Sequence, residues 1–192
     1  MACYSLAGTQ KKALRDGYTI VFVDESGFYL LPGLVRTYAP CGQTPMLHCF
    51  ETRDHLAAMS GITMSGQLYT MVRDEALTSA HSVLFLQHLW RHLGGKVLVI
   101  WDGSPIHKGE VKTFLSAGGA RFIHLEQLPP YAPDLNPDEG VWQQLKHVEL
   151  RNLCCRDLPH LRRELHLAIM RLRRKPHVIQ ACFAGAQLCT KT

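Results

Sequence analysis

Three carboxylates occupy positions that suit chemistry. Asp24 follows the apolar run Thr-Ile-Val-Phe-Val, and Asp102 follows the similar run Val-Leu-Val-Ile-Trp. Ligands of open α/β sheets bind just beyond the ends of strands, so an aspartate after a buried strand is well placed for binding or catalysis. An aspartate close to a glycine is also a common turn former, and for either residue alone that interpretation is the simpler one.

The third carboxylate, Glu139, lies in the segment Leu-Asn-Pro-Asp-Glu-Gly-Val-Trp. With Asn136 as N-cap and Pro137 as the first helical residue, Glu139 would be the third residue of a helix. A glutamate there can simply complete a capping box. The rigid lead-in Pro-Pro-Tyr-Ala-Pro-Asp-Leu-Asn-Pro favours a functional role, because it would fix the helix start as accurately as a metal ligand requires.

These carboxylates predict a metal site if the fold brings them together. Should the strands before Asp24 and Asp102 be neighbours in one sheet, the two aspartates would converge. Adjacent carboxylates repel unless a cation lies between them, and carboxylate oxygens suit a hard ion such as Mg²⁺. We therefore expect Asp24, Asp102 and Glu139 to meet at one end of a sheet.

The secondary structure that must position them is predicted from periodicity. The expected strands are rich in β-branched and aromatic residues and are Thr19–Val23, Ala57–Met64, Gln67–Val72, Lys96–Trp101 and Arg121–Leu125. The expected helices are Ser79 to about Leu93, Lys108 to about Ala117, Asp138–Leu150, Leu158–Arg173 and Pro176 to about Leu188. This order predicts an α/β fold with a mixed central sheet flanked by helices.

Composition is that of an ordinary globular chain. It has 192 residues, of which 46% are hydrophobic and 19% charged. No apolar run reaches the roughly 18 residues of a membrane span, and no secretory signal begins the chain, so we expect a cytoplasmic protein without a membrane partner. The seven cysteines form no CxxC pair, which speaks against a disulfide framework and a zinc site.

The basic residues are concentrated near the C-terminus. The segment Lys146–Lys175 carries nine basic and three acidic residues, whereas the whole chain has a net charge of only +5. This surplus either binds a polyanion or forms a solvated helix face.

Three motifs together resemble a known family. Val-Asp-Glu-Ser-Gly, Ile-Trp-Asp-Gly-Ser-Pro-Ile-His and Leu-Pro-Pro-Tyr-Ala-Pro-Asp-Leu-Asn-Pro-Asp-Glu-Gly-Val-Trp are similar to motifs of mariner-like bacterial insertion-sequence transposases, which belong to the DDE superfamily. Thirty-six residues separate Asp102 from Glu139, close to the spacing in that group. The third motif is long and specific, and the resemblance runs from about Thr19 to about Arg173.

The resemblance implies an RNase H-like fold and a metal-dependent DNA endonuclease and strand transferase. Asp24, Asp102 and Glu139 would be its catalytic and metal-binding triad. They would hold two Mg²⁺ ions, for which Mn²⁺ could substitute, and would hydrolyse and transfer DNA strands at transposon ends. DNA would be the partner, and the protein would associate with the bacterial nucleoid.

The expected domains follow from the same comparison. Residues 1–18 would be an N-terminal lead-in, 19–175 the RNase H-like catalytic domain, and 176–192 a C-terminal helix and tail. Full-length relatives carry a helix-turn-helix module before the catalytic part, but only 23 residues precede Asp24. That module would therefore belong to a separate polypeptide, lie in a second reading frame or be lost, and a homodimer is a further expectation.

The remaining site residues are weaker predictions. Lys146 lies seven residues after Glu139, on the same helix face, and either contacts a DNA phosphate or is an ordinary exposed lysine. His107 either contacts substrate, orients the active-site loop or is structural. Arginines of the basic segment would contact DNA phosphates; they are Arg162, Arg163, Arg173 and Arg174.

One departure from the family concerns the residue after the second aspartate, which is commonly asparagine or a similar polar residue and here is Gly103. Two alternatives to the transposase remain open. The chain could be a non-catalytic remnant that binds DNA or partner subunits through its arginine-rich helices. It could also be an RNase or junction nuclease on the same fold.

Overall fold

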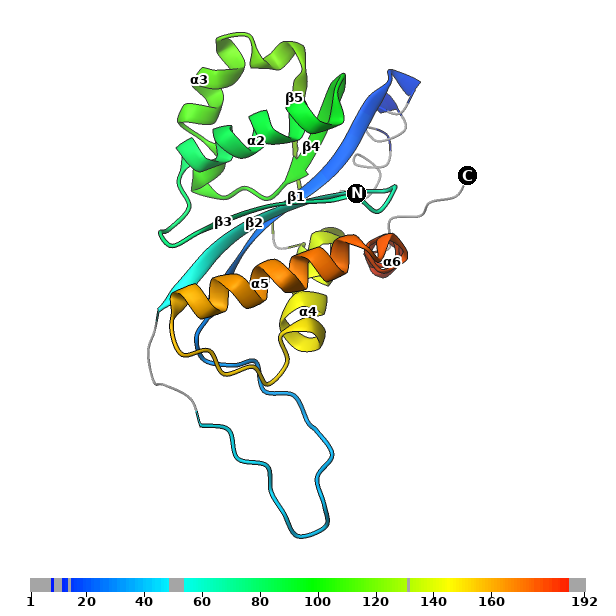
Figure 1. Cartoon of the computed structure of the whole chain (residues 1–192). Coiled ribbons are helices and arrows are strands. Elements are labelled where there is room, and N and C mark those ends of the chain that lie inside the picture. The colour runs from blue at the N-terminus through cyan, green and yellow to red at the C-terminus, as the bar shows by residue number, and fades with distance from the viewer. Residues whose placement is uncertain (1–7, 9–11, 14, 49–53, 131, 187–192) are drawn as a thin grey trace.

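The computed structural model describes residues 8, 12–13, 15–48, 54–130 and 132–186. A mixed five-stranded sheet in the order β3-β2-β1-β4-β5 forms its centre, with helices on both faces (Figure 1). The strands are β1 (Tyr18–Tyr29), β2 (His55–Thr63), β3 (Leu68–Arg73), β4 (Lys96–Trp101) and β5 (Ile123–Gln127). The helices are α2 (Ser79–Leu93), α3 (Glu110–Ser116), α4 (Asp138–Gln144), α5 (Leu158–Arg173) and α6 (Pro176–Gly185).

The sheet is antiparallel on one side of β1 and parallel on the other. β1, β2 and β3 form an antiparallel meander, while β4 and β5 run parallel to β1. α2 connects β3 to β4, and α3 connects β4 to β5. The predicted mixed sheet flanked by helices is confirmed.

β1 is longer than the sequence predicted. We expected a strand that ended at Val23, with Asp24 beyond it, and this expectation is wrong: β1 continues to Tyr29. The segment Asp-Glu-Ser-Gly resembles a turn, but its pairing with β2 extends as far as Tyr29 opposite His55 and keeps it extended. Tertiary pairing thus overrides the local turn preference of these residues.

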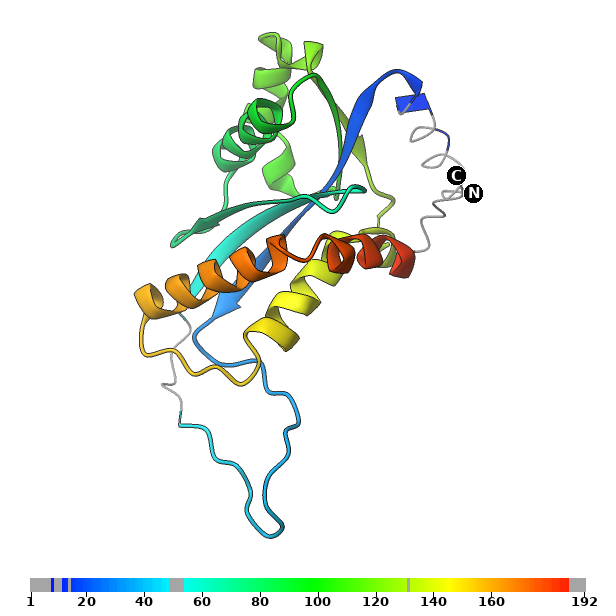
Figure 2. The same ribbon diagram turned by 45° about the vertical axis from the view of Figure 1, so that its right-hand side comes forward.

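Two hydrophobic layers cover the two faces of the sheet. Alternate residues of a strand point to opposite faces. Phe22 and Phe28 of β1 therefore join the core under α4, α5 and α6, whereas Val21 and Val23 join the core under α2 and α3. Figures 1 and 2 show α2 and α3 on one side of the sheet and α4, α5 and α6 on the other.

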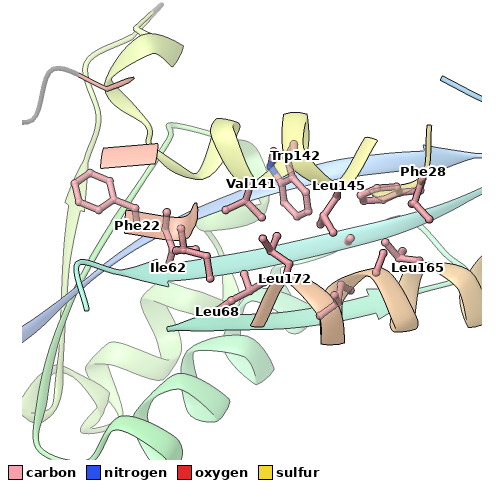
Figure 3. Packing of buried hydrophobic residues seen from close by; sticks show 14 of the residues in the cluster. Phe22, Phe28, Ile62, Leu68, Val141, Trp142, Leu145, Leu165 and Leu172 are labelled. Carbon is pink, nitrogen blue, oxygen red and sulfur yellow. The ribbon is translucent and has the colours of Figure 1, made fainter. Parts of the chain in front are cut away.

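The layer under α4 and α5 contains the larger cluster. Figure 3 shows Val141, Trp142 and Leu145 over the same face of the sheet as Leu165 and Leu172. All five side chains are buried. This layer holds α4, and with it the residues next to Glu139, against the sheet.

The helix predictions hold in most positions. α2 begins after Thr78, in a capping box with His81, and ends before Gly94, as expected. α5 matches its predicted bounds. The predicted helix 138–150 is instead α4 followed by a π-helical turn, Leu145–Glu149.

Three further expectations concern the end of α6, membrane-spanning helices and the domain boundaries. α6 ends at Gly185, and the last residues of its predicted range lie outside the part that the structure describes. None of the described helices is long and apolar enough to cross a membrane. The domain boundaries predicted above stay a prediction.

Gly140 allows α4 and α6 to pack closely. A Cβ atom on Gly140 would lie 2.8 Å from the Sγ atom and 3.0 Å from the Cβ atom of Cys182 in α6, whereas one on Gly185 would meet nothing within 4 Å. We expect Gly140→Ala to lower the free energy of unfolding by about 1 to 3 kcal/mol, as overpacking does. Gly185→Ala should be neutral or stabilising by up to about 1 kcal/mol, because alanine favours helices.

Denaturant titration of both variants measures this difference. If Gly140→Ala were as stable as Gly185→Ala, the close contact between the two helices would not constrain the fold.

Candidate active site

The register of β1 and β4 brings the segments that carry Asp24 and Asp102 to neighbouring strands. The parallel pairing ends at Phe22 opposite Ile100. Carried two residues further, this register would bring the backbone of Asp102 opposite that of Asp24, whereas the Asp102 carboxylate groups with Glu25 and His107, whose ligand atoms lie within 4.8 Å of one another. The expectation that their two strands are neighbours is therefore confirmed. Asp24 is inside β1, but it lies in the part of β1 that is no longer paired to β4.

Asp24 is anchored by a tryptophan of α4. The Trp142 Nε1–H donates a hydrogen bond of 3.0 Å to Asp24 Oδ2. The Trp142 ring is buried and packs edge-on against Phe28, with ring centroids 5.8 Å apart. Sequence spacing predicted only a packing role for Trp142, because spacing does not show where an indole N–H points.

The surroundings of Asp24 disfavour the ionised form of its carboxyl group. Burial, together with the negative charges of Glu139 and Glu25, raises its pKa to about 7, against the opposing effect of hydrogen bonds from the Glu25 backbone and from Trp142. Glu139 is thus close enough to Asp24 for its charge to matter. A divalent cation would relieve this repulsion, so the donor set fits the hard metal ion predicted from the sequence.

Glu139 is positioned through its backbone. The preceding Asn136 donates from Nδ2 to the carbonyl of Val23, at 3.4 Å, and its Oδ1 accepts from the Asp138 N–H, at 3.2 Å. Pro137, not Asn136, is the residue directly before α4, which corrects the predicted cap by one position. Within the described residues the Glu139 carboxylate accepts no hydrogen bond, and its side chain is exposed.

Asp138 is a buried acid that the sequence did not single out. Its Oδ2 accepts a 2.7 Å hydrogen bond from Ser60 Oγ, and Ser60 lies opposite Asp24 in β2. Its Oδ1 is buried without a partner in the described part of the chain. Burial raises the pKa of Asp138 well above its ordinary value.

Asp102 is held on the opposite side of the site by a histidine. Its Oδ1 accepts from the Ser104 N–H at 2.9 Å and lies 3.0 Å from His107 Nδ1. His107 Nε2 lies 2.7 Å from Glu25 Oε1, and the ring stacks on Trp101 with centroids 3.8 Å apart. Burial lowers the pKa of His107, but the hydrogen bond and charge of Glu25 and the contact with Asp102 outweigh it, so the net shift is upward.

These contacts bear on the roles predicted for His107. Its side chain is 4% exposed, so it favours the orienting role over a direct DNA contact. Glu25, Asp102 and His107 also form a group whose ligand atoms lie within 4.8 Å of one another, a spacing that a metal ion could use. Glu25 was missed at the sequence level because its partner is distant in the chain.

Lys146 points toward the site from the π-helical turn. Its Nζ donates a 2.7 Å hydrogen bond to Ser26 Oγ and lies 5.4 Å from the centroid of the Phe28 ring. Burial lowers its pKa, and the charges of Glu139 and Asp24 oppose that shift. Lys146 is therefore the cation beside the carboxylates, as its spacing from Glu139 suggested.

The neighbourhood of Gly103 accounts for the departure noted in the sequence. A Cβ atom at this position would collide with the side-chain amide of Gln127, at the end of β5. Gln127 occupies the space that a side chain at 103 would need.

The four arginines predicted to bind DNA differ in their surroundings. Arg162 pairs with Asp74, and Arg173 donates to the carbonyl of Leu68, at 3.0 Å, and to Thr70 Oγ1, at 3.1 Å. These two arginines tie α5 to β3 and the segment that follows it. Arg163 and Arg174 are exposed, and Arg163 contacts only its neighbour Glu164, at 3.3 Å, among the described residues.

Comparison with known proteins decides the family. The sequence pattern of the family described as "DDE superfamily endonuclease" matches residues 19–162, which include Asp24, Asp102 and Glu139. The chain belongs to this family. A comparison with curated proteins gives no match.

Solved structures agree with the family in fold. The Mos1 mariner paired-end complex with Mn is similar with a TM-score of 0.64 and 17% identity, over 95% of this chain and 58% of that one. The Mos1 paired-end complex with left transposon end gives a TM-score of 0.60 and 17% identity, over 97% and 60%. The catalytic domain of Mos1 mariner transposase gives 0.53 and 16%, over 96% and 90%.

The Mos1 structures are covered by this chain to different extents. This chain spans about 60% of the length of the Mos1 chains in the DNA complexes, but 90% of the isolated catalytic domain. The fold is therefore that of the Mos1 catalytic domain, and the predicted RNase H-like architecture is confirmed.

The raised pKa of Asp24 predicts how stability depends on pH without metal. The folded state binds the Asp24 proton more tightly than the unfolded state does, so its contribution to stability is lost as the pH rises from about 4 to about 7. Asp24→Asn removes the charge. We expect the variant to gain about 1 to 4 kcal/mol in unfolding free energy over wild type between pH 5 and pH 8.

Denaturant titrations with a chelator at the two pH values measure this gain. The exposed Asp134, replaced by asparagine, is the control and should show little change. An equal pH dependence for wild type and Asp24→Asn would contradict the electrostatic strain.

Proposed function

We propose that this chain is the catalytic domain of a DNA transposase, which hydrolyses phosphodiester bonds and transfers strands at transposon ends with divalent metal ions. The observation that carries the proposal is the crowding of Asp24 by Glu139, beside the strand end that bears Asp102, inside a segment that matches the DDE endonuclease family. A partly buried carboxylate that is repelled by a neighbouring one is costly for folding, and metal binding would offset this cost.

The metal ligands in this proposal are Asp24, Asp102 and Glu139. Their oxygens suit Mg²⁺, with Mn²⁺ as a substitute, and two ions are the number that the chemistry favours. Mos1 complexes with Mg and with Mn are among the structures of similar fold, which supports this choice. When bound, such ions activate a water or a 3′-hydroxyl and stabilise the leaving oxygen.

The chain's own residues orient this machinery. Trp142 donates to Asp24 Oδ2 and so fixes the orientation of this carboxylate for metal binding. Asn136 fixes the start of α4 to β1 and so positions Glu139 near Asp24. Within the described residues the Glu139 carboxylate accepts no hydrogen bond that metal binding would have to break. Lys146 would exchange its bond to Ser26 for a DNA phosphate next to the reacting bond.

The non-catalytic alternative is not favoured. A remnant that only bound DNA would have no need of three distant acidic residues, and the family match includes all of them. A separate helix-turn-helix polypeptide, a homodimer and a cytoplasmic, nucleoid-associated location in a bacterium stay predictions.

Replacement of Asp102 tests the function directly. Asp102→Asn keeps the shape of the side chain and removes its charge, so it should abolish cleavage of oligonucleotide transposon ends with Mg²⁺ or Mn²⁺. The fold and DNA binding should remain. A cleavage assay with matched melting curves and a binding assay measures all three properties, and Glu110→Gln, an exposed residue at the start of α3, is the control.

Retained metal-dependent cleavage by purified Asp102→Asn would rule out the mechanism. Absence of cleavage by wild type on every transposon-end substrate would leave DNA binding as the only supported activity.

DNA affinity should depend on salt through the basic segment. If its side chains meet phosphates, binding falls with a log–log slope of about −0.9 per neutralised phosphate. The contacts of the four arginines indicate which of them can bind DNA phosphates. Arg163 and Arg174 are exposed, and within the described residues the side chain of Arg163 pairs only with its neighbour Glu164. Neutralising these two arginines should therefore flatten the slope on every duplex alike, since phosphate contacts do not read bases.

Neutralising Arg162 and Arg173 is the matched comparison, because these residues already bond within the chain. Their loss should reduce stability more than it changes the slope. Equal slopes for wild type and all variants would mean that the segment is a solvated surface.

A further inference from the structure

We propose that Glu25 and His107 are positioning residues that hold the Asp102 carboxylate in place for metal binding. The proposal rests on the function given above to Asp102, and it assigns different roles to the adjacent acids Asp24 and Glu25. Asp24 would bind metal, whereas Glu25 would act only through His107.

The alternation of β1 separates these two acids. Asp24 lies on the face of Phe22 and Phe28, toward α4, and bonds to Trp142 there. Glu25 lies on the face of Val23, toward the core under α2 and α3. Neighbouring residues of an extended strand cannot share a face, so Glu25 projects from the face opposite the one on which Asp24 meets α4.

His107 closes the gap between β1 and the loop after β4. Its ring nitrogens lie 2.7 Å from Glu25 Oε1 and 3.0 Å from Asp102 Oδ1. The same Nδ1 also lies 3.0 Å from the backbone carbonyl of Asp102. The ring is nearly parallel to Trp101, at 5°, and its side chain is 4% exposed, so packing locks its orientation.

This geometry suits a bridge better than a metal ligand. The two nitrogens of an imidazole point in different directions, and here each faces a different acid. An ion on the Nε2 lone pair would face Glu25 and lie on the far side of the ring from the Asp102 carboxylate. His107 therefore links Glu25 to Asp102 and keeps them apart, although their ligand atoms lie within 4.8 Å.

Asp102 needs such support. Its side chain is 54% exposed and sits on a loop, where it accepts a hydrogen bond from the Ser104 N–H. His107 Nδ1 hydrogen-bonds to the backbone carbonyl of Asp102 and lies 3.0 Å from the carboxylate oxygen as an ion-pair contact. Outer-sphere partners of metal ligands typically change metal affinity by about 10- to 100-fold. Loss of the bridge should weaken metal binding by that factor and leave the triad itself intact.

The test is a double-mutant cycle on Mn²⁺ binding without DNA. Glu25→Leu removes the acceptor, and His107→Phe keeps an aromatic ring on Trp101 but removes both nitrogens. Free Mn²⁺ is measured by electron paramagnetic resonance for wild type, both variants and the double variant. Thermal melting with a chelator identifies any variant that fails to fold, and Glu110→Gln is the control.

We expect each single variant to bind Mn²⁺ about 10- to 100-fold more weakly, and the double variant to be no weaker than the worse single one. Glu25→Gln, which keeps an acceptor for a His107 N–H, should recover part of the loss. Multiplicative effects in the double variant would make Glu25 a ligand in its own right. Unchanged affinity in both folded single variants would overturn the bridge.

One more variant, Asp102→Asn, separates this inference from the proposed function. Asp102→Asn should weaken Mn²⁺ binding if Asp102 is a ligand. If it does, but Glu25→Leu and His107→Phe do not, only the bridge is wrong. If Asp102→Asn has no effect on Mn²⁺ binding, the proposed triad fails.

Where His107→Phe does not fold, His107→Gln replaces it. Glutamine retains an N–H that can reach one acid but cannot bridge two, so its Mn²⁺ affinity should fall as well. An affinity equal to wild type in this folded variant would also count against the bridge.

Discussion

The site depends on a difference in length between the two pairings of β1. With β4 the pairing ends at Phe22 opposite Ile100, whereas with β2 it continues to Tyr29. Beyond Phe22 the chain is still a strand, with alternating side chains, but its β4 side has no partner strand. β2 therefore keeps Asp24 in an extended strand just beyond the point where the pairing with β4 ends, and its side chain bonds to Trp142 of α4.

The hydrophobic layers make this arrangement tolerable. Asp24, Glu139 and the buried Asp138 repel one another in a partly desolvated place, so the acids destabilise the metal-free fold. The core under α4 and α5 compensates and also fixes Trp142, whose indole both packs and donates to Asp24. The Trp142 side chain therefore contributes both to the core and to the site, because its packing determines where its N–H points.

Much of this could be predicted from the sequence, and the exceptions share a cause. Periodicity predicted the bounds of α2 and α5, with Gly94 marking the end of α2, and the motifs and their spacing indicated the family. The end of β1 and the roles of Glu25, Asp138 and Trp142 could not be predicted, since each depends on a partner far away in the chain. Local turn preference was misleading at Asp24, where strand pairing decides the conformation.

The measurement that tests this account most directly is the anomalous diffraction of Mn²⁺ in crystals of this chain. The account predicts Mn²⁺ peaks on the face of β1 toward α4, with oxygens of Asp24, Asp102 and Glu139 as ligands and the His107 bridge to Glu25 intact. A Mn²⁺ ion bound by Glu25 and His107, with Asp24 still occupied only by Trp142, would contradict it.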